Sequence, residues 1–467
     1  MKDKLWGGAF SKETDERAWT FGQSVTTDAT MWAEELQVSI AHVRMLGSTG
    51  VLTEHDAIRI EDGLEQIYAE FLERYKSSED PASLLKEPVA NAEDIHSAIE
   101  TLLKEKIGDV AGRLHAGRSR NDQVATVTRL WLKNRSDQLI DSIKNVQYTI
   151  CGLAERYADA SMPGFTHTQP AQPLTLGFHL MAYFWMLQRD VMRISALRLQ
   201  ECPLGAGAVA GTSLPVSREM TAKNLGFAGP MPNALDATSD RDFIGDALHT
   251  CATLMQHLSR FSHELVFWSN PLIGFVKLDE SLTTGSSIMP QKRNPDMAEL
   301  IRGRAARVIG HWTGFMSMMK GLPLGYNRDQ QEDKPPLFDS FRLCFDSLYL
   351  CLAMIETAEF NVKRMAEVAG DGFSTATGVA EALVMDGMPF RQAHEVTGSL
   401  VRQCEAQGIA LHQLKVDDAR LQAILLSATV GASIASRNGH GGPGPDAMKA
   451  QLEEAKACLM AKDLKEG

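Results

Sequence analysis

The feature that most constrains the fold of this chain is the spacing of its apolar residues, which recur every three or four positions over long stretches. Three such runs lie at 176–197, 248–268 and 300–319. This spacing places the apolar side chains on one face of a long helix. Convincing runs of period-two alternation, which would mark half-buried strands, are missing from the sequence. We therefore predict an all-α fold.

The longest helical patterns lie in the middle third of the chain, and long helices with an apolar stripe need partners that cover it. A helical bundle within the chain provides such partners, and oligomerisation would cover any stripe that remains exposed. The length of 467 residues is typical of about three domains. We expect an N-terminal helical domain at 1–112, a central helical bundle at 113–364 and a C-terminal helical domain at 365–467.

Composition argues against several classes of protein. Acidic residues outnumber basic ones by 59 to 47, whereas a nucleic-acid-binding protein usually carries a basic excess. The chain begins without an apolar signal segment, and its longest dense apolar stretch, 180–187, is far too short to span a membrane. The seven cysteines are scattered without CxxC spacing, and the histidines stand singly. We expect a cytoplasmic protein with no metal, nucleic-acid or membrane partner.

The segment 283–296 is a polar loop that leads into a helix. A glycine, two serines and two prolines within a dozen residues cannot lie inside a regular helix. Asn294, followed by Pro295, is predicted to cap the next helix. The loop supplies donors and hydroxyl groups from Lys292, Arg293, Asn294, Ser286 and Ser287. A nearby cation and a helix N-terminus would favour a serine alkoxide that acts as a base, but an ordinary connection between helices remains the alternative at this point.

This loop is similar to the signature of the fumarase/aspartase superfamily. Residues 285–295 read GSSIMPQKRNP and match every fixed position of the pattern GSSxMPxKxNP. The resemblance implies the fold of that superfamily, which has three α-helical domains and a long central helical bundle that forms a homotetramer. It also implies elimination across a C–N or C–O bond without a cofactor, usually with release of fumarate.

Further segments resemble the argininosuccinate lyase family in particular. They read KLWGGAF at 4–10, EDIH at 93–96, HAGRSRNDQ at 115–123, GFTHTQPAQP at 164–173, GLP at 321–323, YN at 326–327 and QEDK at 331–334. The resemblance runs in matching order from about residue 4 to past 390. It implies β-elimination of argininosuccinate to arginine and fumarate, in arginine biosynthesis. It also implies active sites that each draw on three subunits of the tetramer.

The resemblance assigns the proton abstraction to the loop. Ser286 is the expected base, while Ser287 is the alternative and more naturally contacts substrate. Removal of a proton next to a carboxylate creates a carbanion, whose charge must be drawn onto that carboxylate by cations and hydrogen-bond donors. Lys292 and Asn294 suit this role.

Protonation of the leaving nitrogen needs a general acid or an ordered water, and His167 is the candidate acid. Glu299 is the family's partner for it, because a histidine in this role needs a carboxylate to orient it. Asp94 either binds the guanidino or amino end of the substrate or caps a helix. The other positions that match substrate contacts of the family are Ser24, Arg118, Ser119, Arg120, Asn121, Thr166, Tyr326, Gln331 and Lys334. The arginines suit the succinyl carboxylates, although a helix N-terminus with solvated charges is the alternative for 118–121, and a plain loop the alternative for Ser24.

Two alternative interpretations of the function remain. Another fumarate-releasing lyase, such as adenylosuccinate lyase or aspartase, is disfavoured by the combination of HAGRSRNDQ and QEDK. A non-catalytic paralogue similar to δ-crystallin would be expected to have lost site residues, and here they are all present. The chain departs from the family pattern at Ala9, at 374–380, where an acidic residue is lost, and at 442–445, which read GPGP. These positions lie outside the expected chemical core.

Overall fold

A computed structural model describes residues 14–460 of the chain. Within that range the structure is all-α apart from short strands, which confirms the predicted fold class. The motif at 4–10, with Ala9, lies outside the described residues. None of the helices described is both long enough and apolar enough to cross a membrane.

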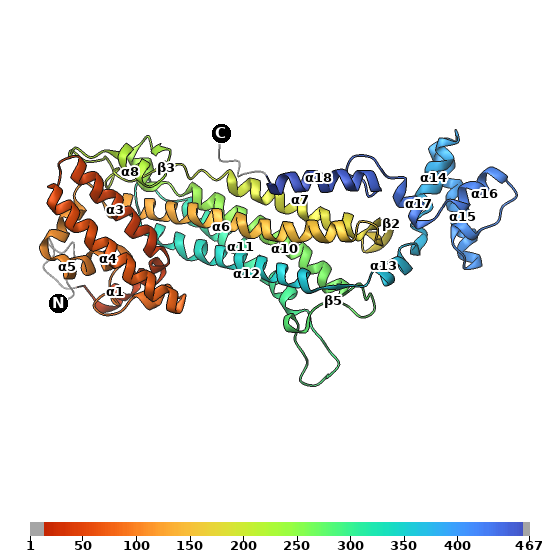
Figure 1. The fold of residues 1–467 in the computed structure, drawn as a ribbon, viewed down its shortest axis with the longest axis horizontal. Helices are drawn as coiled ribbons and strands as arrows, with labels where there is room; N and C mark the ends of the chain where they lie inside the picture. The colour runs from red at the N-terminus through yellow and green to blue at the C-terminus, as the bar shows by residue number, and fades with distance from the viewer. Residues whose placement is uncertain (1–13, 461–467) are drawn as a thin grey trace. The chain divides into compact units, whose positions relative to one another are not determined.

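The described residues form two compact units, each built from three separate stretches of the chain. The first unit contains the residues up to Leu139 together with Ala196–Ala252 and Arg307–Leu343. The second contains Ile140–Ser195, Thr253–Ala306 and the residues from Cys344 onward. Four long helices have residues in both units, namely α6 (Arg120–Arg156), α10 (Asp242–Trp268), α11 (Asp296–Met319) and α12 (Lys334–Thr357) (Figure 1). The three domains expected from the sequence stay a prediction.

The first unit is centred on three packed helices, α3 (Trp32–Ser48), α4 (Glu54–Ser78) and α5 (Ile95–Ile107), coloured red to orange in Figure 1. Trp32 lies in their core and contacts the rings of Tyr68 and Phe71, with centroids 5.3 and 5.9 Å away. The unit also contains α1 (Glu16–Gly22), α2 (Val25–Asp28), α8 (Arg218–Asn224), α9 (Ala234–Ser239), the 3₁₀ helices η2 (Ala29–Met31), η3 (Pro81–Leu84), η4 (Gly108–His115) and η6 (Arg328–Asp333), and the parallel strands β3 (Glu201–Cys202) and β4 (Gly229–Pro230).

The second unit combines α7 (Leu176–Ser195) with the C-terminal helices. These are α13 (Val362–Val368), α14 (Ala376–Met385), α15 (Phe390–Gln407), α16 (Ala419–Leu426), α17 (Val430–Ala435) and α18 (Pro445–Met460), with 3₁₀ helices η5 (Glu280–Leu282), η7 (Asp371–Phe373) and η8 (Leu411–Gln413). Helices α14 to α16 enclose a small core that includes Leu383, Leu400 and Leu425. Other large apolar side chains of these helices, such as Met385 and Phe390, are exposed.

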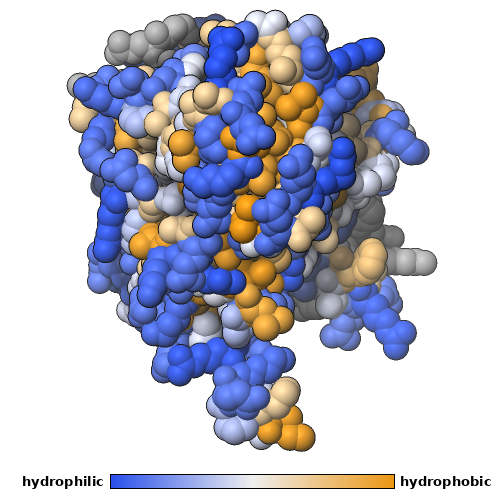
Figure 2. Space-filling model, turned by 90° about the vertical axis from the view of Figure 1, so that its right-hand side faces the viewer, coloured by the Kyte–Doolittle hydropathy of each residue, from blue (hydrophilic) through white to orange (hydrophobic). Residues whose placement is uncertain are grey.

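Figure 2 shows one face of the molecule, on which hydrophobic residues lie in patches among hydrophilic ones.

The helices predicted from apolar spacing are confirmed as α7, α10 and α11. The predicted cap of α11 is wrong in detail. The helix begins at Asp296, and the carbonyl of Pro295 accepts the first helical hydrogen bond, from the N–H of Glu299. The cap position is therefore that of Pro295, and Asn294, one residue earlier, pairs its main chain with that of Thr284. Its amide donates to the carbonyl of Gly285 and closes the base of the loop.

The sequence pattern did not predict a hairpin between α6 and α7. Strands β1 (Ser161–Thr166) and β2 (Gln169–Thr175) pair in antiparallel register, with a bulge between Pro163 and Phe165. Three prolines in this segment exclude a helix, but they also interrupt the alternation by which strands are recognised. A further antiparallel pair is formed by β5 (Val276–Lys277) and β6 (Glu359–Phe360).

Helices α6 and α7 approach closely at Gly177. A Cβ atom at this position would lie 2.3 Å from the carbonyl oxygen of Ala154 on α6. We predict that Gly177→Ala lowers the free energy of unfolding by about 1–3 kcal/mol, because the backbones must move apart. Urea unfolding measures the change. Gly152→Ala, on α6 with open space around its Cβ, is the matched control and should instead add roughly 0.5–1 kcal/mol. Equal effects of the two variants would contradict the close approach.

Candidate active site

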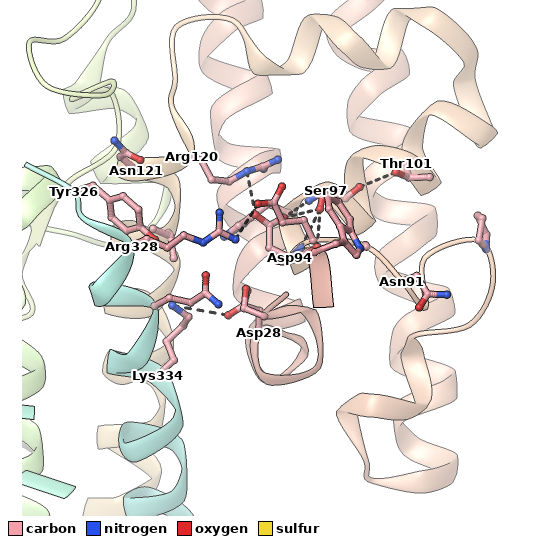
Figure 3. Close-up of a pocket in the computed structure, with 18 residues that line it drawn as sticks. Asp28, Asn91, Asp94, Ser97, Thr101, Arg120, Asn121, Tyr326, Arg328 and Lys334 are labelled. Atoms are coloured by element: carbon pink, nitrogen blue, oxygen red, sulfur yellow. Dashed lines mark hydrogen bonds and ion pairs between the residues drawn. The ribbon is translucent and has the colours of Figure 1, made fainter. Parts of the chain in front are cut away.

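A cavity of about 500 Å³ lies in the first unit, which is large enough for a small organic ligand. Its walls come from the start of α2, the segment 88–97, the first turns of α6, and the segment from Tyr326 to the start of α12 (Figure 3). Seven residues predicted to contact substrate line this cavity. They are Ser24, Asp94, Arg120, Asn121, Tyr326, Gln331 and Lys334.

Lys334 is a buried cation in the wall of the cavity, only 3% exposed. Its Nζ lies 3.2 Å from Oδ1 of Asp333 and 3.9 Å from Oδ1 of Asp28, toward which it points in Figure 3. Burial alone would lower the pKa of Lys334, but the two carboxylates outweigh burial and raise it. The other oxygen of Asp333 accepts a 2.7 Å hydrogen bond from Arg241, which is also fully buried. Lys334 is therefore charged and held in place at the edge of the cavity.

Arg120 and Asp94 form a second pair in the cavity wall. Nε of Arg120 lies 3.4 Å from Oδ2 of Asp94 (Figure 3). Nη1 of Arg120 lies 3.3 Å from Oε1 of Glu100, which is outside the cavity lining. Oδ1 of Asp94 accepts a hydrogen bond from the N–H of Ser97 and forms a capping box at the start of α5. Asp94 thus caps a helix, which was one of its two predicted roles, and also faces the cavity.

Hydrogen bonds hold Ser24 and Gln331 in the wall of the cavity. The Ser24 hydroxyl donates to Asp28 over 2.5 Å, and its N–H donates to the carbonyl of Glu93. Gln331 and Arg328 both donate to the carbonyl of Gly22. Arg328, a third cation of the wall, was not predicted as a site residue from the sequence.

Behind the wall lies a fully buried carboxylate, Glu35 on α3. It lies 2.5 Å from Nδ1 of His96, which lines the cavity, and it accepts hydrogen bonds from Gln123 and Ser39. Burial alone would lower the pKa of His96, but Glu35 outweighs burial and raises it. The other ring nitrogen of His96 is buried and has no hydrogen-bond partner within residues 14–460. The EDIH motif includes His96, whereas no sequence signal marks Glu35.

Arg118 is not among the residues that line this cavity, and its role as a substrate contact stays a prediction. Its side chain is fully buried, donates to Ser39 and lies 3.7 Å from Glu100, so it supports the cavity wall from behind. Ser119 is likewise absent from the cavity lining, and its main-chain N–H donates to Asp122. Asn121 is the second residue of α6, which begins at Arg120, and it lines the cavity.

The signature loop belongs to the second unit, and most of its side chains are exposed. Oγ of Ser286 accepts hydrogen bonds from the N–H groups of Met289, at 3.2 Å, and Ile288, at 3.4 Å. Ser287 and Lys292 are exposed at the surface of the loop. Lys292 also lines a cavity of about 740 Å³ between the loop and strands β5 and β6.

The remaining predicted residues of the second unit lie on two other elements. Thr166 ends β1, and His167 is at the tip of the β1–β2 hairpin, where both are exposed. Glu299 is in the first turn of α11 and lies 3.8 Å from Arg302. Within the described part of one chain, His167 and Glu299 make no hydrogen bond or ion pair with each other. No three His, Cys, Asp or Glu side chains among residues 14–460 are grouped as metal ligands would be.

Comparisons with known proteins agree on one family. A model described as "Lyase" matches residues 8–310, and one described as "Argininosuccinate lyase C-terminal" matches 373–436. The argininosuccinate lyase of Carboxydothermus hydrogenoformans is 46% identical over 98% of this chain and 100% of its own length. That of an Exiguobacterium species is 44% identical over 98% of each. The crystal structure of EDDS lyase in complex with formate is similar, with a TM-score of 0.81 and 28% identity over 95% of this chain and 88% of that chain.

Glu100, which contacts Arg120 of the cavity wall, makes the free energy of unfolding depend on pH. Burial alone would raise the pKa of Glu100, but the hydrogen bond with His115 and the charges of Arg120 and Arg118 lower it to about 2. Because this value lies below the ordinary 4.5, the stabilisation is complete above pH 4.5 and is lost as the pH falls toward 2. We predict that Glu100→Gln lowers the free energy of unfolding at pH 7 by about 3 kcal/mol.

The difference in free energy of unfolding between wild type and Glu100→Gln should become smaller as the pH falls below 4.5. Urea unfolding between pH 7 and pH 3.5 measures this difference. Glu105→Gln, at an exposed position of the same helix, should change the free energy of unfolding by less than about 0.5 kcal/mol. If the difference in free energy of unfolding between wild type and Glu100→Gln stays constant down to pH 3.5, the lowered pKa of Glu100 is contradicted.

Proposed function

We propose that this chain, which belongs to the argininosuccinate lyase family, catalyses the β-elimination of argininosuccinate to arginine and fumarate as a step of arginine biosynthesis. The single observation that carries the proposal beyond family membership is the cavity of the first unit. Residues from four separate motifs, at 93–96, 115–123, 326–327 and 331–334, line this one cavity, although they are far apart in the sequence.

The charges of the cavity support a substrate that carries both signs. Lys334, Arg120 and Arg328 offer cations to carboxylates, while Asp28 and Asp94 offer carboxylates to an ammonium or guanidinium group. Burial raises the pKa of Tyr326, which keeps its hydroxyl protonated as a hydrogen-bond donor. An elongated molecule that carries both carboxylates and cationic groups suits these walls.

The loop supports proton abstraction by Ser286. A hydroxyl that accepts two main-chain N–H groups is stabilised as an alkoxide, since each donor favours the charged form. Lys292 and Asn294 then draw the charge of the carbanion onto the neighbouring carboxylate, and the guanidino nitrogen leaves with a proton from His167 or from a water. No such pair of donors is found for Ser287 among the described residues, so Ser286 remains the preferred base.

We also propose a cytoplasmic homotetramer whose active sites draw on more than one subunit. An exposed face of α11 that carries Ile309, Gly310, Thr313 and Met316 supports assembly, because large apolar groups in open solvent favour burial against another chain. His167 and Glu299 would then pair between subunits rather than within one. A cytoplasmic location is supported by the seven cysteines, none of which forms a disulfide.

The reaction is tested by the rise in fumarate absorbance when the purified protein meets argininosuccinate. We predict turnover with argininosuccinate and none with adenylosuccinate or aspartate. Ser286→Ala should lower kcat by roughly 10²–10⁴-fold through loss of the base. Ser287→Ala is the matched control and should raise KM more than it lowers kcat. No fumarate from the wild type would refute the proposal, and equal losses of kcat in both variants would refute the choice of base.

Shared sites are tested by mixing inactive variants. Ser286→Ala and His167→Asn, each inactive alone, should recover about a quarter of wild-type activity in mixed tetramers, because random assembly unites an intact Ser286 with an intact His167 from another subunit in one site of four. Ser286→Ala mixed with Lys292→Met should recover nothing, since both changes lie on the same loop. Absence of recovery in the first mixture, with tetramers verified by light scattering, would argue against sites that combine these two residues from different subunits.

A further inference from the structure

The turn between β1 and β2 has an unusual backbone. Thr166 and Gln169 pair across it, so His167 and Thr168 are its two central residues. Both have positive φ angles, 53° for His167 and 59° for Thr168. A two-residue hairpin turn with positive φ at both positions is normally built from asparagine and glycine. For a β-branched residue such as Thr168 this conformation is a steric outlier.

The surrounding structure holds the turn in this conformation. The antiparallel pairs of β1 and β2 fix both ends of the turn. Pro170 restricts Gln169 to an extended conformation and lies against Gly372 of η7. Strand β1 packs on α13, and β2 packs on α17 and η7. Backbone strain of this kind persists only where neighbouring contacts determine the conformation, and it is enriched at functional sites.

Thr168 adds a local restraint of its own. Its hydroxyl donates to the carbonyl of His167 over 2.6 Å, and its Cβ excludes backbone conformations that a glycine would allow. A glycine would adopt the positive φ without strain, but it would also allow many other conformations of the same turn. The exposed imidazole of His167 is thus carried by a backbone that has little freedom.

We propose that Thr168 is a positioning residue, whose side chain limits the backbone freedom of the turn so that the imidazole of His167 meets the leaving nitrogen in one orientation. This inference rests on the proposed function, in which His167 acts on that nitrogen. The backbone freedom of a glycine in this turn would cost orientation of the acid at the moment of proton transfer.

Two variants at this position separate strain from freedom. Thr168→Gly removes the strain and adds freedom, so kcat should fall by roughly tenfold while KM stays within about twofold and Tm does not fall. Thr168→Asn removes much of the strain but keeps a side chain that tolerates positive φ, so kcat should stay within about twofold of wild type while Tm rises by about 1–3 °C. Fumarate release and thermal unfolding of the tetramer measure these effects.

Glu79→Gly is the matched control, because Glu79 also has a positive φ, 55°, but ends α4 outside the cavity lining. It should raise Tm without changing kcat. The proposal is overturned if Thr168→Gly keeps wild-type kcat or if its Tm is lower than that of wild type. It is also overturned if kcat falls as far in Thr168→Asn as in Thr168→Gly. In the last case the hydroxyl itself would be the required feature.

Amide hydrogen exchange at 166–169 tests the turn without reference to activity. Thr168→Gly should exchange faster there than wild type and Thr168→Asn, with no change at the end of α4. Unchanged exchange in Thr168→Gly would overturn the proposal even if kcat fell. A wild-type protein that releases no fumarate would refute the proposed function instead, and the exchange comparison would then decide the role of Thr168 by itself.

Discussion

One buried carboxylate, that of Asp333, is shared by two buried cations, and the cavity of the first unit depends on it. An ammonium or guanidinium group withdrawn from water is costly unless it is paired with an opposite charge. Arg241 and Lys334 both satisfy this requirement at Asp333, and Lys334 has Asp28 as a second partner. The start of α12 is thereby fixed against the start of α10 and the end of α2. Loss of Asp333 would leave Arg241 without its carboxylate and Lys334 with Asp28 as its remaining carboxylate partner, so the cavity and the fold share one constraint.

The amino-acid sequence predicts the long helices well, because their apolar residues form a stripe that only a helix places on one face. It predicts the cavity residues through family motifs, which keep their order and spacing. It does not reveal Glu35, because that residue lies in an ordinary helical stretch and meets His96 only through packing across 61 positions. It also misplaces the cap of α11, because the pairing of Asn294 with Thr284 depends on how the loop folds back on itself.

The cavity, the signature loop and the hairpin tip are held in different ways. Buried ion pairs fix the cavity wall, so its geometry tolerates little change. The loop is mostly exposed, and few contacts restrain it besides its closed base at Thr284 and Asn294. The tip at His167 is exposed as well, but the strands and prolines behind it restrict its backbone. A wall fixed by buried ion pairs, an exposed loop with few restraints and a tip with a restricted backbone are compatible with the proposal that the active site draws on more than one subunit.

The discontinuous first unit has a consequence for how the protein is made. Asp28 leaves the ribosome early, but Lys334 follows about 300 residues later, which is roughly 15–60 s at ordinary rates of translation. Until then Asp28 lacks its partner Lys334, and the N-terminal helices cannot close around the finished cavity. The last step of folding of this unit therefore waits until Lys334 has been made, and α3, α4 and α5 remain without the finished cavity during synthesis of most of the chain.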